Sequence, residues 1–151
     1  MQEVFCSPRE VSLMSRFEYF EHLADMGIIG WGKTLAEAFE EAAKAMFNLM
    51  VEINQVQPKE RIPIRCQGKD NGEIFIEWLN CLLAEADINS MVFCRFSIDS
   101  VKGGELLGWA EGEEFDPLRH RPKIEVKAAT YSGLATGERD GQFFARCVVD
   151  L

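Results

Sequence analysis

The sequence has few basic residues and no long apolar run, and each absence excludes a class of protein. Its 16 Lys and Arg stand against 25 Asp and Glu, so the 151-residue chain has a formal net charge of −9. An acidic surface repels phosphates, and strong direct binding to RNA or DNA is therefore not expected. No apolar run could cross a bilayer, and residues 1–15 lack the apolar segment of a signal peptide. We therefore expect a soluble, cytoplasmic protein without membrane association.

The cysteines and histidines exclude several kinds of site. The five cysteines are odd in number, widely spaced and without a CxxC pair, which argues against a disulfide framework and a structural zinc site. The two histidines, His22 and His120, are accompanied by no GxSxG motif. The glycines at 27, 30 and 32 match no phosphate-binding fingerprint. The sequence thus contains no recognisable nucleophile triad and no nucleotide-binding motif.

What the sequence does contain is an order of short elements typical of an α+β domain. Helical spacing predicts one helix that begins at Thr34, with Glu37 completing a capping box, and another over 73–86. Strands are expected at 16–21, 28–31, 61–66, 91–99, 105–113, 124–130 and 142–149, with a further short one at 131–135. Because this order is not a regular βαβ alternation, it predicts two helices packed on a mixed or antiparallel sheet.

The chain is expected to form one domain. Its length suits a single domain, and 47% of its residues are apolar, enough for one sizeable core. Residues 1–15 show no clean period, so we interpret them as an extension before a domain that spans residues 16–151. The chain has no internal repeat and no low-complexity segment.

Two aspartates are candidates for a metal site. Asp25 lies with His22 in a predicted turn between the first two strands, and Asp150 directly follows an apolar strand end and precedes Leu151. If the last strand lies beside the first, Asp25, Asp150 and the terminal carboxylate of Leu151 converge. Such a group of oxygens would favour a hard cation such as Ca²⁺, Mg²⁺ or Mn²⁺. The residues alone favour the plainer alternative, in which Asp25 is a turn residue and Asp150 is solvated.

A second set of charges follows a Glu-Glu-Phe-Asp-Pro segment. Alternation places Glu125 and Lys127 on the same side of the strand expected at 124–130. These two residues could form a surface ion pair, which contributes little to stability. They could instead form a charged face for a partner. The sequence alone favours the ion pair.

These blocks together resemble the archease family over about residues 17–151. The matching blocks are Tyr19-Phe20-Glu21-His22-Leu23-Ala24-Asp25-Met26-Gly27, Trp31-Gly32-Lys33-Thr34-Leu35, Gly112-Glu113-Glu114-Phe115-Asp116-Pro117 with Arg119-His120, Glu125-Val126-Lys127-Ala128-Ala129-Thr130-Tyr131 and Val148-Val149-Asp150-Leu151. They occur in the family's order and close to its spacing. Each block alone is weak, but the combination is specific.

The resemblance implies an accessory protein and no enzyme. Archeases support the tRNA-splicing RNA ligase, which uses GTP and a divalent metal, by promoting its guanylylation and multiple turnover. By resemblance, Asp25, Asp150 and Leu151 are metal ligands, and the cation is Ca²⁺, Mn²⁺ or Mg²⁺. By resemblance also, Glu125, Lys127 and His22 serve partner binding or activation. Leu23 stands where the family usually has Thr, which puts the surroundings of the metal in doubt.

Two alternatives from other classes stay open. A metal-dependent hydrolase of a small phosphate substrate would need only two carboxylates and a metal-bound water, although the sequence marks no clear general acid or base beyond His22. A chaperone-like protein-binding module would instead need a large exposed apolar patch and would not need Asp25. Loss or retention of activity in an Asp25→Ala variant separates these alternatives.

Overall fold

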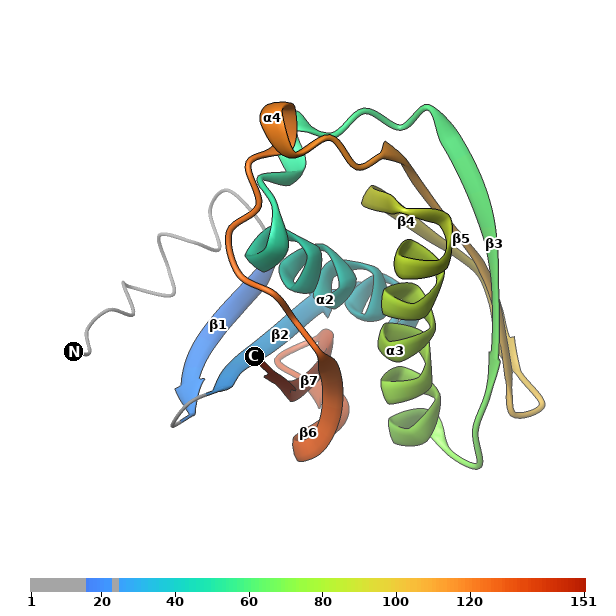
Figure 1. Cartoon of the computed structure of the whole chain (residues 1–151). Coiled ribbons are helices and arrows are strands. Elements are labelled where there is room, and N and C mark those ends of the chain that lie inside the picture. Colours follow the sequence, from blue (N-terminus) through green and yellow to red (C-terminus); the bar gives the residue numbers. More distant parts are fainter. Residues whose placement is uncertain (1–15, 23–24) are drawn as a thin grey trace.

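The computed structural model describes residues 16–22 and 25–151, and Figure 1 shows the course of the chain. The predicted extension, residues 1–15, lies outside the described residues. The strands are β1 (Phe17–His22), β2 (Asp25–Gly32), β3 (Glu60–Gln67), β4 (Met91–Lys102), β5 (Glu105–Glu114), β6 (Ala128–Arg139) and β7 (Gln142–Asp150). The helices are α2 (Leu35–Met50), α3 (Asn71–Asn89) and the short α4 (Pro117–His120), with a 3-10 turn at Ile53–Gln55.

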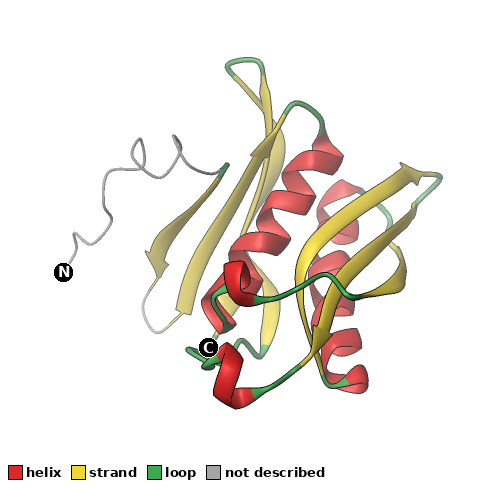
Figure 2. Cartoon of the chain, turned by 90° about the horizontal axis from the view of Figure 1, so that it is seen from above, coloured by secondary structure: helices red, strands yellow, loops and turns green. Residues whose placement is uncertain are grey.

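The strands form two antiparallel sheets with the two long helices between them. One sheet has the order β1-β2-β7-β6 and the other the order β3-β5-β4. Helix α2 contacts β2 and β7 on one side and β4 on the other, while α3 contacts β3 and β6, and Figure 2 shows both helices between the sheets. The expected α+β class is therefore confirmed, and the sheets are antiparallel. The sequence did not indicate that the strands divide into two sheets.

Helix α2 begins where the capping signal predicts. The Thr34 hydroxyl accepts a hydrogen bond from the Glu37 N–H at 3.1 Å. The Glu37 carboxylate reaches back one residue further than expected and accepts from the Lys33 N–H at 2.8 Å. These bonds satisfy backbone donors of the first turn. The middle of its apolar stripe, which includes Phe39 and Met46, is fully buried, while Leu35 and Met50 at its ends are partly buried.

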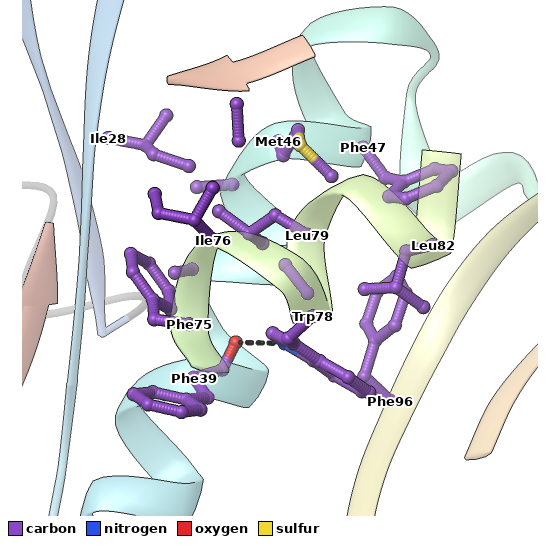
Figure 3. Close-up of a cluster of buried hydrophobic side chains, with 14 of the residues drawn as sticks. Ile28, Phe39, Met46, Phe47, Phe75, Ile76, Trp78, Leu79, Leu82 and Phe96 are labelled. Carbon is purple, nitrogen blue, oxygen red and sulfur yellow. Dashed lines mark hydrogen bonds between the residues drawn. The ribbon is translucent and has the colours of Figure 1, made fainter. Parts of the chain in front are cut away.

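The core is centred on the contact between the two helices. Trp78 of α3 is fully buried, and its indole N–H donates a hydrogen bond of 3.0 Å to the main-chain oxygen of Phe39 on α2 (Figure 3). The ring of Phe96 on β4 lies edge-on to Trp78, which extends the cluster to the second sheet. Helix α3 is buried on several sides because it faces strands of both sheets. No helix among the described residues is long and apolar enough to cross a membrane.

The first hairpin differs from the prediction. The stretch from His22 to Gly27 was expected to be a turn, but β1 ends at His22 and β2 begins at Asp25. Met26 and Gly27 pair with residues of β1, so they belong to the ladder and the connection is confined to residues 23–24. The expectation of a turn at Asp25 was therefore wrong, because strand pairing extends further than alternation in the sequence showed.

The described cysteines are free thiols, which agrees with the absence of a disulfide framework. They are Cys66, Cys81, Cys94 and Cys147, and Cys6 lies outside the described residues. Burial raises the pKa of Cys66 and of Cys147 to about 12. These two thiols are therefore protonated at neutral pH and are poor nucleophiles.

Gly30 allows β2 to approach α2 closely, and it provides a test of this packing. A Cβ at Gly30 would overlap main-chain atoms of Ala38 and Ala42. We expect Gly30→Ala to lower the free energy of unfolding by about 3 kcal/mol, because a backbone overlap cannot be relieved by a side-chain rotation. Urea denaturation measures the change. The matched control is Gly137→Ala, where a Cβ would meet only the Phe144 ring at 3.3 Å. Equal unfolding midpoints for the two variants would contradict the close helix–strand contact.

Candidate functional site

Asp25 and Asp150 lie at the same end of the four-stranded sheet. Strands β2 and β7 are antiparallel neighbours with Met26 opposite Val149, and one further step of this register sets Asp25 opposite Asp150. Residues directly opposite each other on antiparallel strands project from the same face, with Cβ atoms about 4.5–5.5 Å apart. Convergence of the two aspartates was expected on the condition that the last strand lies beside the first, whereas β7 pairs with β2. We call Asp25 and Asp150, which lie directly beyond the Met26–Val149 pair, the carboxylate end.

The surroundings of this end come from three strands and the last residue. His22 pairs with Asp25 across the first hairpin, although its side chain lies outside what the structure describes. On the other side, Ala128 of β6 pairs with Asp150. Leu151 is partly buried and packs against the main apolar cluster, which fixes the main chain that follows Asp150. Three neighbouring strands thus contribute His22 (β1), Asp25 (β2) and Asp150 (β7), and Leu151 directly follows β7.

The donor set suits a hard cation but is incomplete. Asp25 is half-buried and Asp150 is exposed, so both carboxylates are open to solvent. Among residues 16–22 and 25–151, no three or more His, Cys, Asp or Glu side chains are grouped to hold a metal ion. Because Ca²⁺ takes six to eight oxygen ligands, two aspartates and a main-chain carboxylate would leave several positions for water or for groups of another molecule.

The strand expected at 124–130 is wrong in its first half. Residues 121–127 have no regular structure, and β6 begins at Ala128. The Lys123 and Ile124 N–H groups donate to main-chain oxygens in the last turn of α2, at 2.8 and 3.2 Å. Those oxygens have no partner within the helix. The segment therefore caps α2 and does not extend the sheet.

We call residues 115–127 the crossover, because they connect the second sheet to the first (Figure 1). Glu125 and Lys127 are both exposed, and Val126 between them is buried. The Lys127 N–H donates a 2.8 Å hydrogen bond to the main-chain oxygen of Asp150. The end of the crossover, with the main chain of Lys127, is thereby held against the carboxylate end.

Sequence reasoning missed a buried polar network at the start of the crossover. Glu113 is 3% exposed and His120 is 1% exposed, and the His120 Nε2 lies 2.9 Å from a carboxylate oxygen of Glu113. The other ring nitrogen of His120 accepts a 2.9 Å hydrogen bond from the Asp116 N–H. Since Nδ1 is an acceptor, the ring is neutral and its proton lies on Nε2, which donates to Glu113. The Phe115 ring stacks on the imidazole.

Glu113 gathers partners from two other parts of the chain, the connector before β3 and helix α4. Its carboxylate accepts from the Gln57 N–H at 2.8 Å, lies 2.5 Å from the Arg119 guanidinium and is 3.6 Å from the Lys59 ammonium. Burial raises the pKa of Glu113, but the hydrogen bonds from Arg119, His120 and Gln57 lower it further, to about 2. The carboxylate is therefore ionised at all physiological pH values.

This network is an anchor and is not suited to proton transfer. Both nitrogens of His120 are hydrogen-bonded within the protein and the ring is buried. A general base needs a nitrogen that can reach a substrate. The sequence offered only a faint indication of this network. Strand alternation sets Glu113 on the outer face of β5, on the same side as Trp109 and Glu111. Only the fold shows that α4 covers it.

Comparison with known proteins identifies the family. Residues 17–151 match the Archease protein family. The chain belongs to the archease family. The archease of Pyrococcus furiosus is 41% identical over 143 residues, which cover 91% of this chain and 100% of that protein. The archease of Sulfolobus acidocaldarius is 37% identical over 139 residues, which cover 91% of this chain and 100% of that protein. The resemblance inferred from the sequence blocks is confirmed.

Solved structures of similar proteins share the archease fold. A solution structure of a Methanobacterium thermoautotrophicum protein has a TM-score of 0.79 and 32% identity, and covers 90% of this chain and 99% of that one. A crystal structure of a Thermotoga maritima archease, described as a possible chaperone, has a TM-score of 0.57 and 18% identity, and covers 87% and 94%. The second likeness concerns the fold alone.

The Glu113 carboxylate should make archease stability sensitive to acid. Its folded pKa of about 2 is below the ordinary value of 4.5, so its stabilisation is complete above pH 4.5 and is lost as the pH falls towards 2. We expect Glu113→Gln to lower the free energy of unfolding at pH 7 by about 2 kcal/mol and to flatten the decline between pH 4.5 and 2. Thermal melts over this range test it, with exposed Glu114→Gln as the control. Parallel pH profiles of wild type and Glu113→Gln would contradict the assignment.

Proposed function

We propose that this archease is a metal-binding accessory protein, not an enzyme, that activates a GTP-dependent tRNA-splicing RNA ligase. It would act by promoting guanylylation of the ligase and thus multiple turnover. The observation that carries the proposal is the pairing of Met26 with Val149, from which the next residues along the two strands are Asp25 and Asp150. Membership of the archease family supports it. The proposed metal ligands are Asp25, Asp150 and the main-chain carboxylate of Leu151.

The openness of the carboxylate end suits a role beside another active site. Three oxygen groups bind a hard cation without filling its coordination shell. A partner can supply the missing ligands from its own side chains or from the phosphates of bound GTP. A cation held by Asp25, Asp150 and the Leu151 carboxylate would supply positive charge to neutralise nucleotide phosphates. Ca²⁺ is the expected ion in vitro, and Mn²⁺ or Mg²⁺ would serve with a nucleotide.

The charge of the protein fits a basic partner. A protein that holds RNA presents Lys and Arg to the phosphates. A chain with a net charge of −9 is complementary to such a surface and repels the RNA itself. We therefore propose an RNA ligase as the partner and no strong RNA binding by the archease alone. Glu125 and Lys127 lie in the crossover next to the carboxylate end, where they can contact the ligase.

A chaperone-like module remains the second candidate, since the Thermotoga maritima relative is described as a possible chaperone. In the described residues, the large exposed apolar side chains lie on different segments of the chain. They are Ile88, Leu107, Leu118, Ile124 and Tyr131. Single exposed apolar residues are normal on soluble proteins. The third candidate, a metal-dependent hydrolase, requires a general base. His120 is not free to serve, which leaves His22 as the candidate histidine for that role.

Metal binding tests the carboxylate end directly. We expect Asp25→Asn and Asp150→Asn each to weaken Ca²⁺ and Mn²⁺ binding by more than about tenfold, because each removes one anionic ligand. Isothermal titration calorimetry measures the affinities. The matched control is Asp140→Asn in the hairpin at the opposite end of β7. Unchanged affinity in Asp25→Asn would show that this residue is not a ligand.

Ligase activation tests the proposed function. In a guanylylation assay with labelled GTP, wild type should stimulate the ligase of its own organism, and Asp25→Asn and Asp150→Asn should not. In chelator, the free energy of unfolding of both variants should lie within about 0.5 kcal/mol of the wild-type value, as measured by thermal melts. The reason is that neighbouring carboxylates repel one another without a cation. If Asp25→Asn melts far below wild type, its inactivity would reflect folding. Full stimulation by a well-folded Asp25→Asn would favour the chaperone-like role.

A further inference from the structure

Asn80 of α3 forms a two-sided clamp on the edge of the first sheet. Its amide nitrogen donates a 3.0 Å hydrogen bond to the main-chain oxygen of Ala129, and its amide oxygen accepts from the Ala129 N–H at 2.8 Å. Strand β6 is an edge strand, with β7 as its partner in the sheet. The side chain of Asn80 thus takes the place of a neighbouring strand for one residue of β6.

An asparagine is required for this arrangement. The clamp needs one donor and one acceptor on the same short planar group, which the primary amide provides. The two backbone partners fix which end is oxygen and which is nitrogen. An aspartate of the same shape has no donor, and its second oxygen would face the Ala129 carbonyl. An alanine would leave both backbone groups without this partner.

The clamped residue lies beside the proposed site. Ala129 pairs with Val149, and its neighbour Ala128 pairs with Asp150. Two residues before Ala129, the Lys127 N–H bonds to the main-chain oxygen of Asp150. Asn80 itself projects from a helix that is buried between the two sheets. It therefore ties the end of the crossover to the most rigid part of the core.

The crossover is held at its other points as well. Glu113 and His120 anchor its first part, and Lys123 and Ile124 bond to the end of α2. Figure 1 shows this segment passing from α4 along α2 to β6. Among these side-chain anchors, the clamp at Ala129 lies nearest in sequence to the point where the crossover meets Asp150, beside the pairing of β6 with β7. The position of Lys127 therefore depends on Asn80 more directly than on the other anchors.

We infer that Asn80 is a positioning residue that holds Lys127 and Glu125 in place beside the Asp25–Asp150 end. This inference rests on the proposed function, in which these two residues contact the ligase. Asn80 touches neither aspartate, and β2 and β7 are paired without it. The clamp should thus control how the crossover is presented to the partner and leave metal binding unchanged.

Amide hydrogen exchange tests the clamp without any partner. In Asn80→Asp the Lys127 amide should exchange roughly tenfold faster, because the Lys127–Asp150 bond opens more readily once its neighbour is released. Amides in the middle of α2 should be unchanged. The matched control is Asn89→Asp on the same helix, where the side chain bonds only to Glu85. If Asn80→Asp does not fold, Asn80→Ala takes its place and should show the same local effect.

Ligase stimulation then tests the role. Asn80→Asp should lower maximal stimulation of guanylylation at least fivefold while its Mn²⁺ affinity equals that of wild type. Stimulation equal to wild type, or unchanged exchange at Lys127, would overturn the inference. So would faster exchange throughout the protein together with weaker Mn²⁺ binding, since that result means a general loss of structure. If wild type itself does not stimulate the ligase, the proposed function fails. If wild type stimulates the ligase and Asn80→Asp stimulates it equally well, only the role of the clamp is contradicted.

Discussion

The pairing of β2 with β7 is the constraint on which the rest of the structure depends. It joins the first hairpin of the domain to its last strand and turns the inward residues Ile28, Cys147 and Val149 towards α2, where all are fully buried. A slip of one residue would turn these side chains to the opposite face, so the apolar core fixes the register. The same register sets Asp25 opposite Asp150. The position of the two carboxylates is therefore maintained by burial elsewhere in the strands, and not by attraction between the charges themselves.

The two-sheet arrangement explains why an irregular segment can be held as firmly as a strand. The crossover must pass from the second sheet to the first across the end of α2, and its backbone groups need partners along the way. The last carbonyls of α2 accept from Lys123 and Ile124, and Asp150 accepts from Lys127. At its start, the buried Glu113 binds groups from two separate segments, the connector at Gln57 and helix α4. Each anchor satisfies a polar group that the fold would otherwise leave unpaired.

Local signals in the sequence were sufficient for features that depend on neighbouring residues. Thr34 caps α2 as expected, and Pro63 lies in β3, an edge strand of its sheet, where a missing N–H is tolerated. The pairing of β1 and β2 as far as His22 and Asp25, and the irregular course of residues 121–127 along the end of α2, depend on main-chain hydrogen bonds that alternation does not reveal. The burial of Glu113 and the clamp from Asn80 are of the same kind. The convergence of Asp25 and Asp150 could be stated from the sequence only as a condition, because no local pattern indicates which strands pair, and their role as metal ligands came from the family resemblance.

The residues that stabilise the fold are different from those that form the carboxylate end, and this difference bears on metal binding. Two solvent-facing carboxylates cost little in a protein whose stability comes from its apolar core and from the Glu113 network. They can therefore remain in place without a metal, and under the proposed function they would bind one reversibly. If a partner completes the coordination shell, as the proposed function requires, then metal binding and partner binding are linked. By this linkage the metal raises the affinity for the partner by the same factor as the partner raises the affinity for the metal. Under the proposed function, an incomplete site would be what allows a small accessory protein to respond to its partner.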